Sequence, residues 1–235
     1  SPATIQMTVI FLRKLISIGQ QKKYIRRDPF VDFKAEKPRG TRRYLTTEEL
    51  KRILQTPILN KQFERARQLF IFCAFTGLAR VDMLRLTPKH IHHYDDGTCE
   101  IRIKRQKTDV EAIIPLLPIA KEILEKYADY KGATLFPFIS EQKYNVAIKR
   151  AFLAARLRRP VTVVNPVTRE QEVKPLNELA SSHLARRCFV GNLYKQVKDP
   201  NLVGALSGHK DGSKAFARYR TIDEQMKTEL VKMLE

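Results

Sequence analysis

The most informative part of the sequence is Ser182-His183-Leu184-Ala185-Arg186-Arg187, in the last third of the chain. His183 and Arg186 are three residues apart, so on a helix their side chains share one face. Downstream, Leu206-Ser207-Gly208-His209 places a second imidazole at a turn or helix start, because glycine interrupts regular structure there. Tyr219 follows within a basic run.

These residue types are the ones that phosphoryl transfer without a metal ion requires. Arginine holds a phosphate through two N–H groups of its planar fork. Imidazole donates or accepts a proton near neutral pH, and a phenol can attack phosphorus and leave again. The spacing therefore predicts a phosphate-handling site made of His183, Arg186, His209 and Tyr219.

The order H-x-x-R, G-H and Tyr resembles the tyrosine recombinases of the phage integrase superfamily, from about Tyr44 to the end of the chain. The local phrases "FTGLA", "KT…IPL", "SSHLARR" and "GH…Y" are typical of integrases from conjugative transposons and related mobile elements. The resemblance implies breakage and rejoining of double-stranded DNA through a 3′-phosphotyrosine link, without a cofactor. It also implies a homotetramer on DNA, with accessory DNA-bending proteins as candidate partners.

The resemblance assigns a further role to a lysine in a β-hairpin, which protonates the leaving 5′ oxygen. Lys107 matches that position. In most of the family the first catalytic arginine follows "TGL", where this chain has Ala79. Arg67 and Arg80 are the alternatives, and a weakened site is a third. We favour Arg67, because an arginine at the start of an apolar helix needs a partner. A structural ion pair is the competing interpretation for both arginines, and Asp82 is a candidate partner that orients an arginine.

The sequence pattern predicts an α+β fold that is mainly helical. Together with the resemblance, it indicates a tyrosine-recombinase catalytic domain with small antiparallel hairpins on one side. The apolar segment 64–78 predicts a central helix that ends at Gly77. Alternation in 99–104, then a polar loop and a strand at 110–117, predicts a hairpin. The other expected elements are helices at 4–25, 46–54, 118–131, 140–157, 182–194, 201–206 and 222–235, and a hairpin at 161–173.

Three segments are expected along the chain. Residues 1–32 are the C-terminal helix of a truncated core-binding domain, 33–43 a basic linker, and 44–235 the catalytic domain. The linker suits either a strap across a phosphate backbone or a solvated connector. The final segment, 222–235, is an amphipathic helix that packs on its own domain or on a neighbouring protomer.

The composition indicates a polyanionic partner, since the net charge is +19 over 235 residues. Three irregularly spaced cysteines predict neither a disulfide framework nor a zinc cluster. The clustered His90, His92 and His93 lack a second ligand group, so we expect no metal. With no long apolar run, the protein is expected in the bacterial cytoplasm, associated with the nucleoid and with no membrane partner. Two rival functions are a DNA-binding regulator with a degenerate site and a type IB topoisomerase.

Overall fold

The computed structural model describes residues 2–33, 44–165, 167–197 and 199–208. The predicted residues His209 and Tyr219 and the expected helix 222–235 lie outside the described residues. The chain divides into two compact units. The first contains residues 1–41 and Pro160–Lys174, and the second contains Arg42–Arg159 and Pro175–Glu235. The expected boundaries after residues 32 and 43 stay a prediction.

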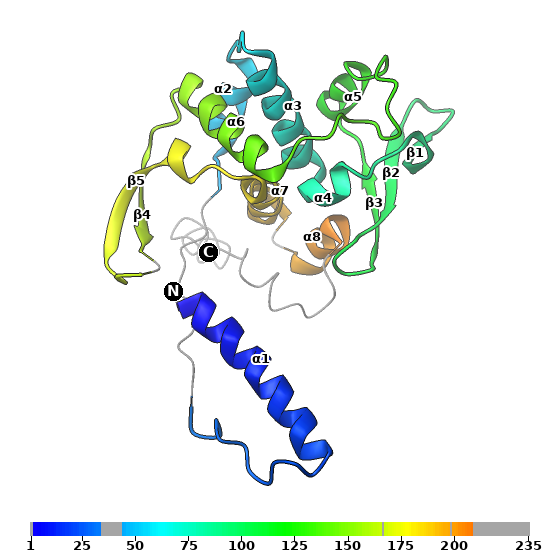
Figure 1. Cartoon of the computed structure of the whole chain (residues 1–235). Coiled ribbons are helices and arrows are strands. Elements are labelled where there is room, and N and C mark those ends of the chain that lie inside the picture. Colours follow the sequence, from blue (N-terminus) through cyan, green and yellow to red (C-terminus); the bar gives the residue numbers. More distant parts are fainter. Residues whose placement is uncertain (1, 34–43, 166, 198, 209–235) are drawn as a thin grey trace, which may run out of the picture. The chain divides into compact units, whose positions relative to one another are not determined.

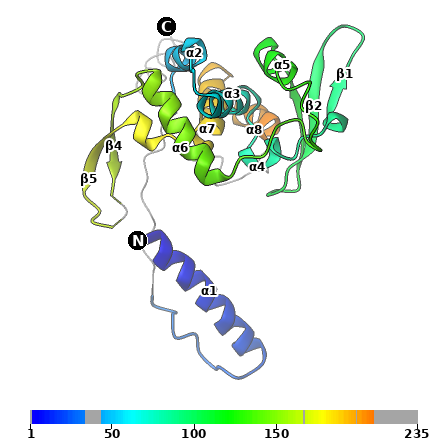
Figure 2. The ribbon, with the colours of Figure 1, turned by 45° about the horizontal axis from the view of Figure 1, so that its top comes forward.

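A single helix organises the second unit (Figures 1 and 2). Helix α3 (Lys61–Thr76) packs against four other helices of this unit. These are α2 (Thr47–Gln55), α5 (Pro118–Glu125), α6 (Glu141–Ala154) and α7 (Ser182–Val197). The remaining helical segments among the described residues of the unit are α4 (Arg80–Met83), α8 (Pro200–Ser207), and the short 3-10 helices η1 (Pro88–His90) and η2 (Leu176–Leu179).

Helix α3 is central because every side chain from Leu69 to Ala74 is apolar and buried. Phe70 and Phe72 are fully buried, and each makes an edge-to-face contact with another ring. The Asn60 side chain accepts two backbone N–H groups at the start of the helix. Gly77 ends it in the left-handed conformation, with φ of 68°. The predicted central helix and its end at Gly77 are therefore confirmed.

Three antiparallel strands form a sheet in the order β1-β2-β3. They span Ile91–His93, Cys99–Lys104 and Glu111–Pro115. In β2, Cys99, Ile101 and Ile103 are buried, while the residues between them are less so. This alternation confirms the predicted hairpin. Helix α8 packs against β3, so the sheet and the end of α8 lie side by side (Figure 1).

The first unit contains helix α1 (Pro2–Gln21) and a two-stranded hairpin, β4 (Pro160–Val164) with β5 (Gln171–Pro175). The predicted hairpin is confirmed. The prediction that the first helix runs to residue 25 is wrong, because α1 ends at Gln21. Lys23 turns left-handed, with φ of 60°, and the Tyr24 N–H donates to the Gly19 carbonyl at 2.8 Å, which ends the helix.

Helices α5 and α6 are shorter than predicted. After α5, the N–H groups of Tyr127 and Tyr130 each bond three residues back, so the chain continues as tight turns. After α6, Arg156 adopts a left-handed conformation with φ of 55°. Over the described ranges, no three His, Cys, Asp or Glu side chains are placed to hold a metal ion. Among the same residues, no helix is both long and apolar enough to cross a membrane.

Candidate active site

Lys107 is exposed in the turn that joins β2 to β3. Two backbone hydrogen bonds close this turn, from the Arg105 N–H to the Val110 carbonyl and from the Asp109 N–H to the Arg105 carbonyl, both at 2.9 Å. Asp109 is left-handed, with φ of 58°, and its carboxylate pairs with Lys104 at 2.9 Å. The hairpin therefore presents the Lys107 amine at its end, on a long flexible stem.

Helix α7 carries His183 in its first turn and Arg186 three residues later. Its start is anchored to α6, because the Ser182 N–H donates to Asn145 Oδ1 at 2.8 Å. The His183 side chain is exposed, whereas Arg186 is only 8% exposed. Arg186 Nη1 donates to the Gly77 carbonyl at 2.5 Å, at the C-terminal end of α3. This contact fixes the guanidinium beside the "TGL" segment.

The surroundings of His183 lower its pKa below the ordinary value of 6.5. Partial desolvation is the main cause, and the positive charges of Arg187, Lys107 and Arg186 add to it, while Glu141 opposes them. The imidazole is therefore mainly neutral at pH 7. Because Lys107 and Arg186 both act on this ring, the structure brings the hairpin lysine and the H-x-x-R motif to one region.

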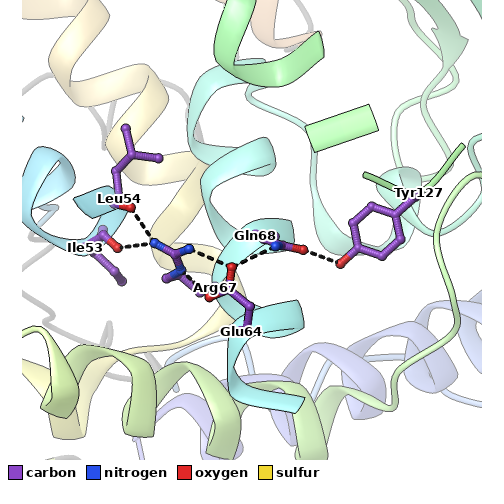
Figure 3. Close-up of polar contacts among 6 residues, drawn as sticks. All are labelled: Ile53, Leu54, Glu64, Arg67, Gln68 and Tyr127. Carbon is purple, nitrogen blue, oxygen red and sulfur yellow. Dashed lines mark hydrogen bonds and ion pairs between the residues drawn. The ribbon is translucent and has the colours of Figure 1, made fainter. Parts of the chain in front are cut away.

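Arg67 is held by the helices around it (Figure 3). Its Nε and Nη2 donate to the two carboxylate oxygens of Glu64, at 2.7 and 2.6 Å. Its Nη1 donates to the Ile53 carbonyl at 3.0 Å and also to the Leu54 carbonyl. These carbonyls belong to the last turn of α2, where backbone acceptors lack helical partners. The contacts favour the structural alternative for Arg67.

Arg80 is directed towards α6 and the loop before it. Its Nη2 donates to the Ile139 carbonyl, and its guanidinium carbon lies 6.0 Å from the centre of the Tyr144 ring. Its Nε is buried and has no hydrogen-bond partner within the described part of the chain. These contacts also favour a structural role, so both sequence candidates for the arginine missing at position 79 are held by neighbouring protein groups.

The sequence interpretation missed a third arginine, Arg105. Its side chain is 4% exposed, and Nη2 forms an ion pair with Asp82 Oδ2 at 3.1 Å. Asp82 is 2% exposed, and its other oxygen accepts the Gln106 N–H at 3.0 Å. Arg105 Nη1 donates to the Ser207 carbonyl at 2.7 Å, at the end of α8. A signal was available in β2, where positions 99, 101 and 103 face inwards and 105 continues that series.

Cys73, in the last turn of α3, lies among these charges. Burial raises the pKa of its thiol to about 12, while Arg105, Arg186 and Arg80 oppose the rise and Asp82 adds to it. The thiol is 2% exposed and points its sulfur at Met83 Sδ, 3.4 Å away. The charges of Arg105, Arg186 and Arg80 therefore all act on this thiol near the C-terminal end of α3.

The segment before His209 is described as far as Gly208, which ends α8 with φ of 61°. The Thr108 hydroxyl donates to the Gly208 carbonyl at 3.4 Å. The turn that carries Lys107 is thus tied to the residue that precedes His209. His209 and Tyr219 themselves lie outside the described residues.

Residues 43–226 match the sequence pattern of the phage integrase family, and the chain belongs to this family. A comparison of the whole sequence with curated proteins finds no significant match.

Solved structures of DNA recombination proteins share the fold. A lambda integrase dimer bound to a COC′ core site matches with a TM-score of 0.70 and 19% identity, over 95% of this chain and 75% of that one. The Tn1549 transposon integrase, in complex with a circular intermediate DNA, matches at 0.69 and 15%, over 99% and 79%. XerH site-specific recombinase bound to difH substrate matches at 0.59 and 22%, over 82% and 54%. This chain therefore spans about half the length of the XerH chain.

Proposed function

We propose that this chain breaks and rejoins double-stranded DNA at specific sites, during integration or excision of a mobile element. Membership of the phage integrase family supports this function. The observation that carries it is the grouping of Lys107, His183 and the buried Arg186 in one unit, since these are the residue types that handle a phosphodiester.

In the proposed reaction, Arg186 and a second guanidinium bind the non-bridging oxygens of one phosphodiester. The Tyr219 oxygen forms a bond to phosphorus, and the bond from phosphorus to the 5′ oxygen breaks. Neutral His183 or His209 takes the phenol proton, and Lys107 gives a proton to the leaving 5′ oxygen. A 5′ hydroxyl of another strand then attacks phosphorus and releases the tyrosine. The ester bond energy stays in the covalent link, so the cycle requires no external energy source.

Strand exchange between two duplexes fits a homotetramer on DNA, with accessory DNA-bending proteins as further partners. A lambda integrase tetramer bound to a Holliday junction is among the structures that share this fold, at a TM-score of 0.62. Since the substrate is chromosomal or mobile-element DNA, the site of action would be the bacterial nucleoid. The net charge of +19 supports a polyanionic partner.

A library of nicked duplexes with a randomised core and a labelled 5′ end tests the proposal. After cleavage, the short fragment beyond the nick diffuses away and leaves a covalent protein–DNA complex. We expect the wild-type chain to give a labelled band that survives denaturing electrophoresis, and Tyr219→Phe to give none. Sequencing the trapped DNA then supplies a defined substrate.

Two other outcomes separate the rival functions. Salt-sensitive DNA binding without a covalent band would refute the recombinase proposal and favour a DNA-binding regulator. Relaxation of a supercoiled plasmid with no sequence preference, and no strand exchange, would favour topoisomerase-like activity. A covalent band that persists with Tyr219→Phe would refute Tyr219 as the nucleophile.

A further inference from the structure

We infer that Arg105 supplies the second phosphate-binding guanidinium of the active site, in place of the arginine that this chain lacks at Ala79. The inference rests on the proposed function, and it names a residue of that same site. Asp82 acts as the positioning residue for Arg105, because its carboxylate binds the Arg105 side chain and the backbone of the next residue.

Burial of this ion pair calls for a functional reason. Arg105 and Asp82 are 4% and 2% exposed, in a unit whose described interior consists mostly of apolar side chains. Removing two charges from water costs several kcal/mol per ion, and apolar residues of similar volume often stabilise a protein equally well or better. A buried guanidinium held by a carboxylate is, however, what a preorganised anion-binding group requires.

The contacts of Arg105 place it where the proposed catalytic segments meet. Lys107 follows two residues later in the same hairpin turn. The Ser207 carbonyl that accepts from Nη1 lies two residues before His209 in sequence. Asp82 follows Ala79 by three residues, so the ion pair joins the "TGL" segment to the hairpin.

Arg105 and Arg186 are also held in the same manner. Each is nearly buried, and each donates to a backbone carbonyl at the C-terminal end of a helix, Ser207 of α8 and Gly77 of α3. Both positive charges, and also that of Arg80, act on the Cys73 thiol of α3. Arg67 and Arg80 instead contact α2 and the α6 region.

The test compares two versions of one substrate, the duplex selected from the nicked library. One version has a phosphate at the scissile position, and the other has a neutral methylphosphonate. A guanidinium that neutralises the scissile phosphate matters for the first substrate and much less for the second. We expect Arg105→Met to slow covalent-complex formation about 10²–10³-fold on phosphate, with a clearly smaller loss on methylphosphonate.

Matched variants separate catalysis from folding. Arg102→Met changes an exposed arginine on the same strand, and it should alter the two rates by the same factor. Arg105→Lys keeps a cation beside Asp82 but loses the planar fork. If Arg105→Met fails to give a cooperative thermal transition, Arg105→Lys takes its place in the test. The comparison is again between its loss of cleavage rate on phosphate and its loss on methylphosphonate.

A rescue experiment tests whether an arginine at position 79 can take over the role of Arg105. Adding Ala79→Arg to the Arg105 variant should restore part of the rate on phosphate, whereas adding it to Arg186→Met should not. If the wild-type chain cleaves, either of two results would overturn the inference. In the first, Arg105→Met loses the same factor in rate on both substrates, and in the second it cleaves at the full wild-type rate. Failure of the wild-type chain to cleave any duplex would instead defeat the proposed function.

Discussion

Arg186 and Arg105 are oriented by partial negative charges that the fold itself provides. Each guanidinium donates to a backbone carbonyl at the C-terminal end of a helix, where carbonyls have no helical partners. Arg105 has a full carboxylate partner in addition, Asp82. Side chains fixed in this way need no reorganisation when a phosphate arrives, which is the condition under which electrostatic catalysis is strongest.

Thiol reactivity gives a prediction for single residues. Burial raises the pKa of Cys73 and of Cys188 to about 12 and also raises that of Cys99, so all three remain protonated at mildly alkaline pH. Since the thiolate is the reactive form, we expect almost no reaction with an aromatic disulfide reagent in the folded chain. In concentrated guanidinium chloride all three thiols should react. A thiol that reacts rapidly in the native protein would contradict the packing described around it.

His183 gives a pH-dependent prediction. Desolvation and neighbouring cations hold its pKa below 6.5 in the folded chain. Between the folded pKa and 6.5, the unfolded chain binds more protons, so a fall in pH through this window weakens folding. Proton NMR titration should give an apparent pKa below 6.5 for the ring signal that His183→Gln removes. A value above 6.5 would mean that Glu141 outweighs burial and the cations.

The β2–β3 hairpin is the element on which the site depends most. Its turn is joined to α4 through Asp82 and to the end of α8 through Ser207 and Gly208. A displacement of α8 would therefore move Arg105 and Lys107 together. This linkage holds together two segments, about a hundred residues apart, that the proposed reaction needs at one phosphate.

Two glycines, Gly204 within α8 and Gly208 at its C-cap, provide a matched test of this linkage. A Cβ on Gly208 would lie 2.3 Å from Arg105 Cδ, and its φ of 61° is unfavourable for other residues, whereas a Cβ on Gly204 meets nothing within 4 Å. We expect Gly208→Ala to lower both cleavage and stability. Gly204→Ala should keep cleavage and raise stability by about 0.5–1 kcal/mol, as alanine does within a helix. Urea denaturation and the covalent-complex assay check both, and equal behaviour of the two variants would contradict the linkage.

Arg67 gives the contrasting prediction, for a residue whose contacts favour a role in joining helices. It connects α2 to α3, and its partner Glu64 also accepts from Gln68, which is bonded to the Tyr127 hydroxyl (Figure 3). Arg67→Met leaves the partly buried Glu64 without its cation, so we expect a marked loss of stability. Below the lowered melting temperature, the rate of covalent-complex formation should be close to that of the wild-type chain. A rate loss at every temperature would indicate phosphate binding instead.

The sequence was sufficient for elements whose pattern is local. Alternation predicted β2 and its hairpin, and the apolar run with Gly77 predicted α3 and its end. Thr46 and Glu49 form the N-terminal capping box of α2 through hydrogen bonds of 3.0 and 3.2 Å. Each of these features depends only on neighbouring residues.

Sequence reasoning alone could not identify the residue that takes the place of the arginine missing at Ala79, because the relevant contacts are long-range. Arg105 meets Asp82 and Ser207, which are distant in sequence. The interpretation favoured Arg67 because it lies in an apolar helix, and the structure supplies its partner from a neighbouring turn and from α2. The one local sign that Arg105 faces inwards was the alternation of buried and exposed positions along β2.

At the scale of the whole molecule, charge and chemistry point to the same partner. The net charge of +19 favours a polyanion, and the family pattern covers residues 43–226, which include every proposed catalytic residue. Phosphate contacts by lysine and arginine release counterions, so DNA binding by this chain is expected to weaken steeply with salt. Binding alone, however, is common to the recombinase and the regulator, and only a covalent bond distinguishes them.

The most direct measurement is therefore the chemical identity of that bond. The trapped complex is digested with nuclease and then with a protease that cuts after lysine, which releases peptide 215–227 with Tyr219 as its one tyrosine. Mass spectrometry should find this peptide carrying a phosphodeoxynucleotide on Tyr219, and Tyr219→Phe should yield no modified peptide. A nucleotide on any other residue, or an unmodified peptide from a chain that is bound to its DNA, would contradict the proposed reaction.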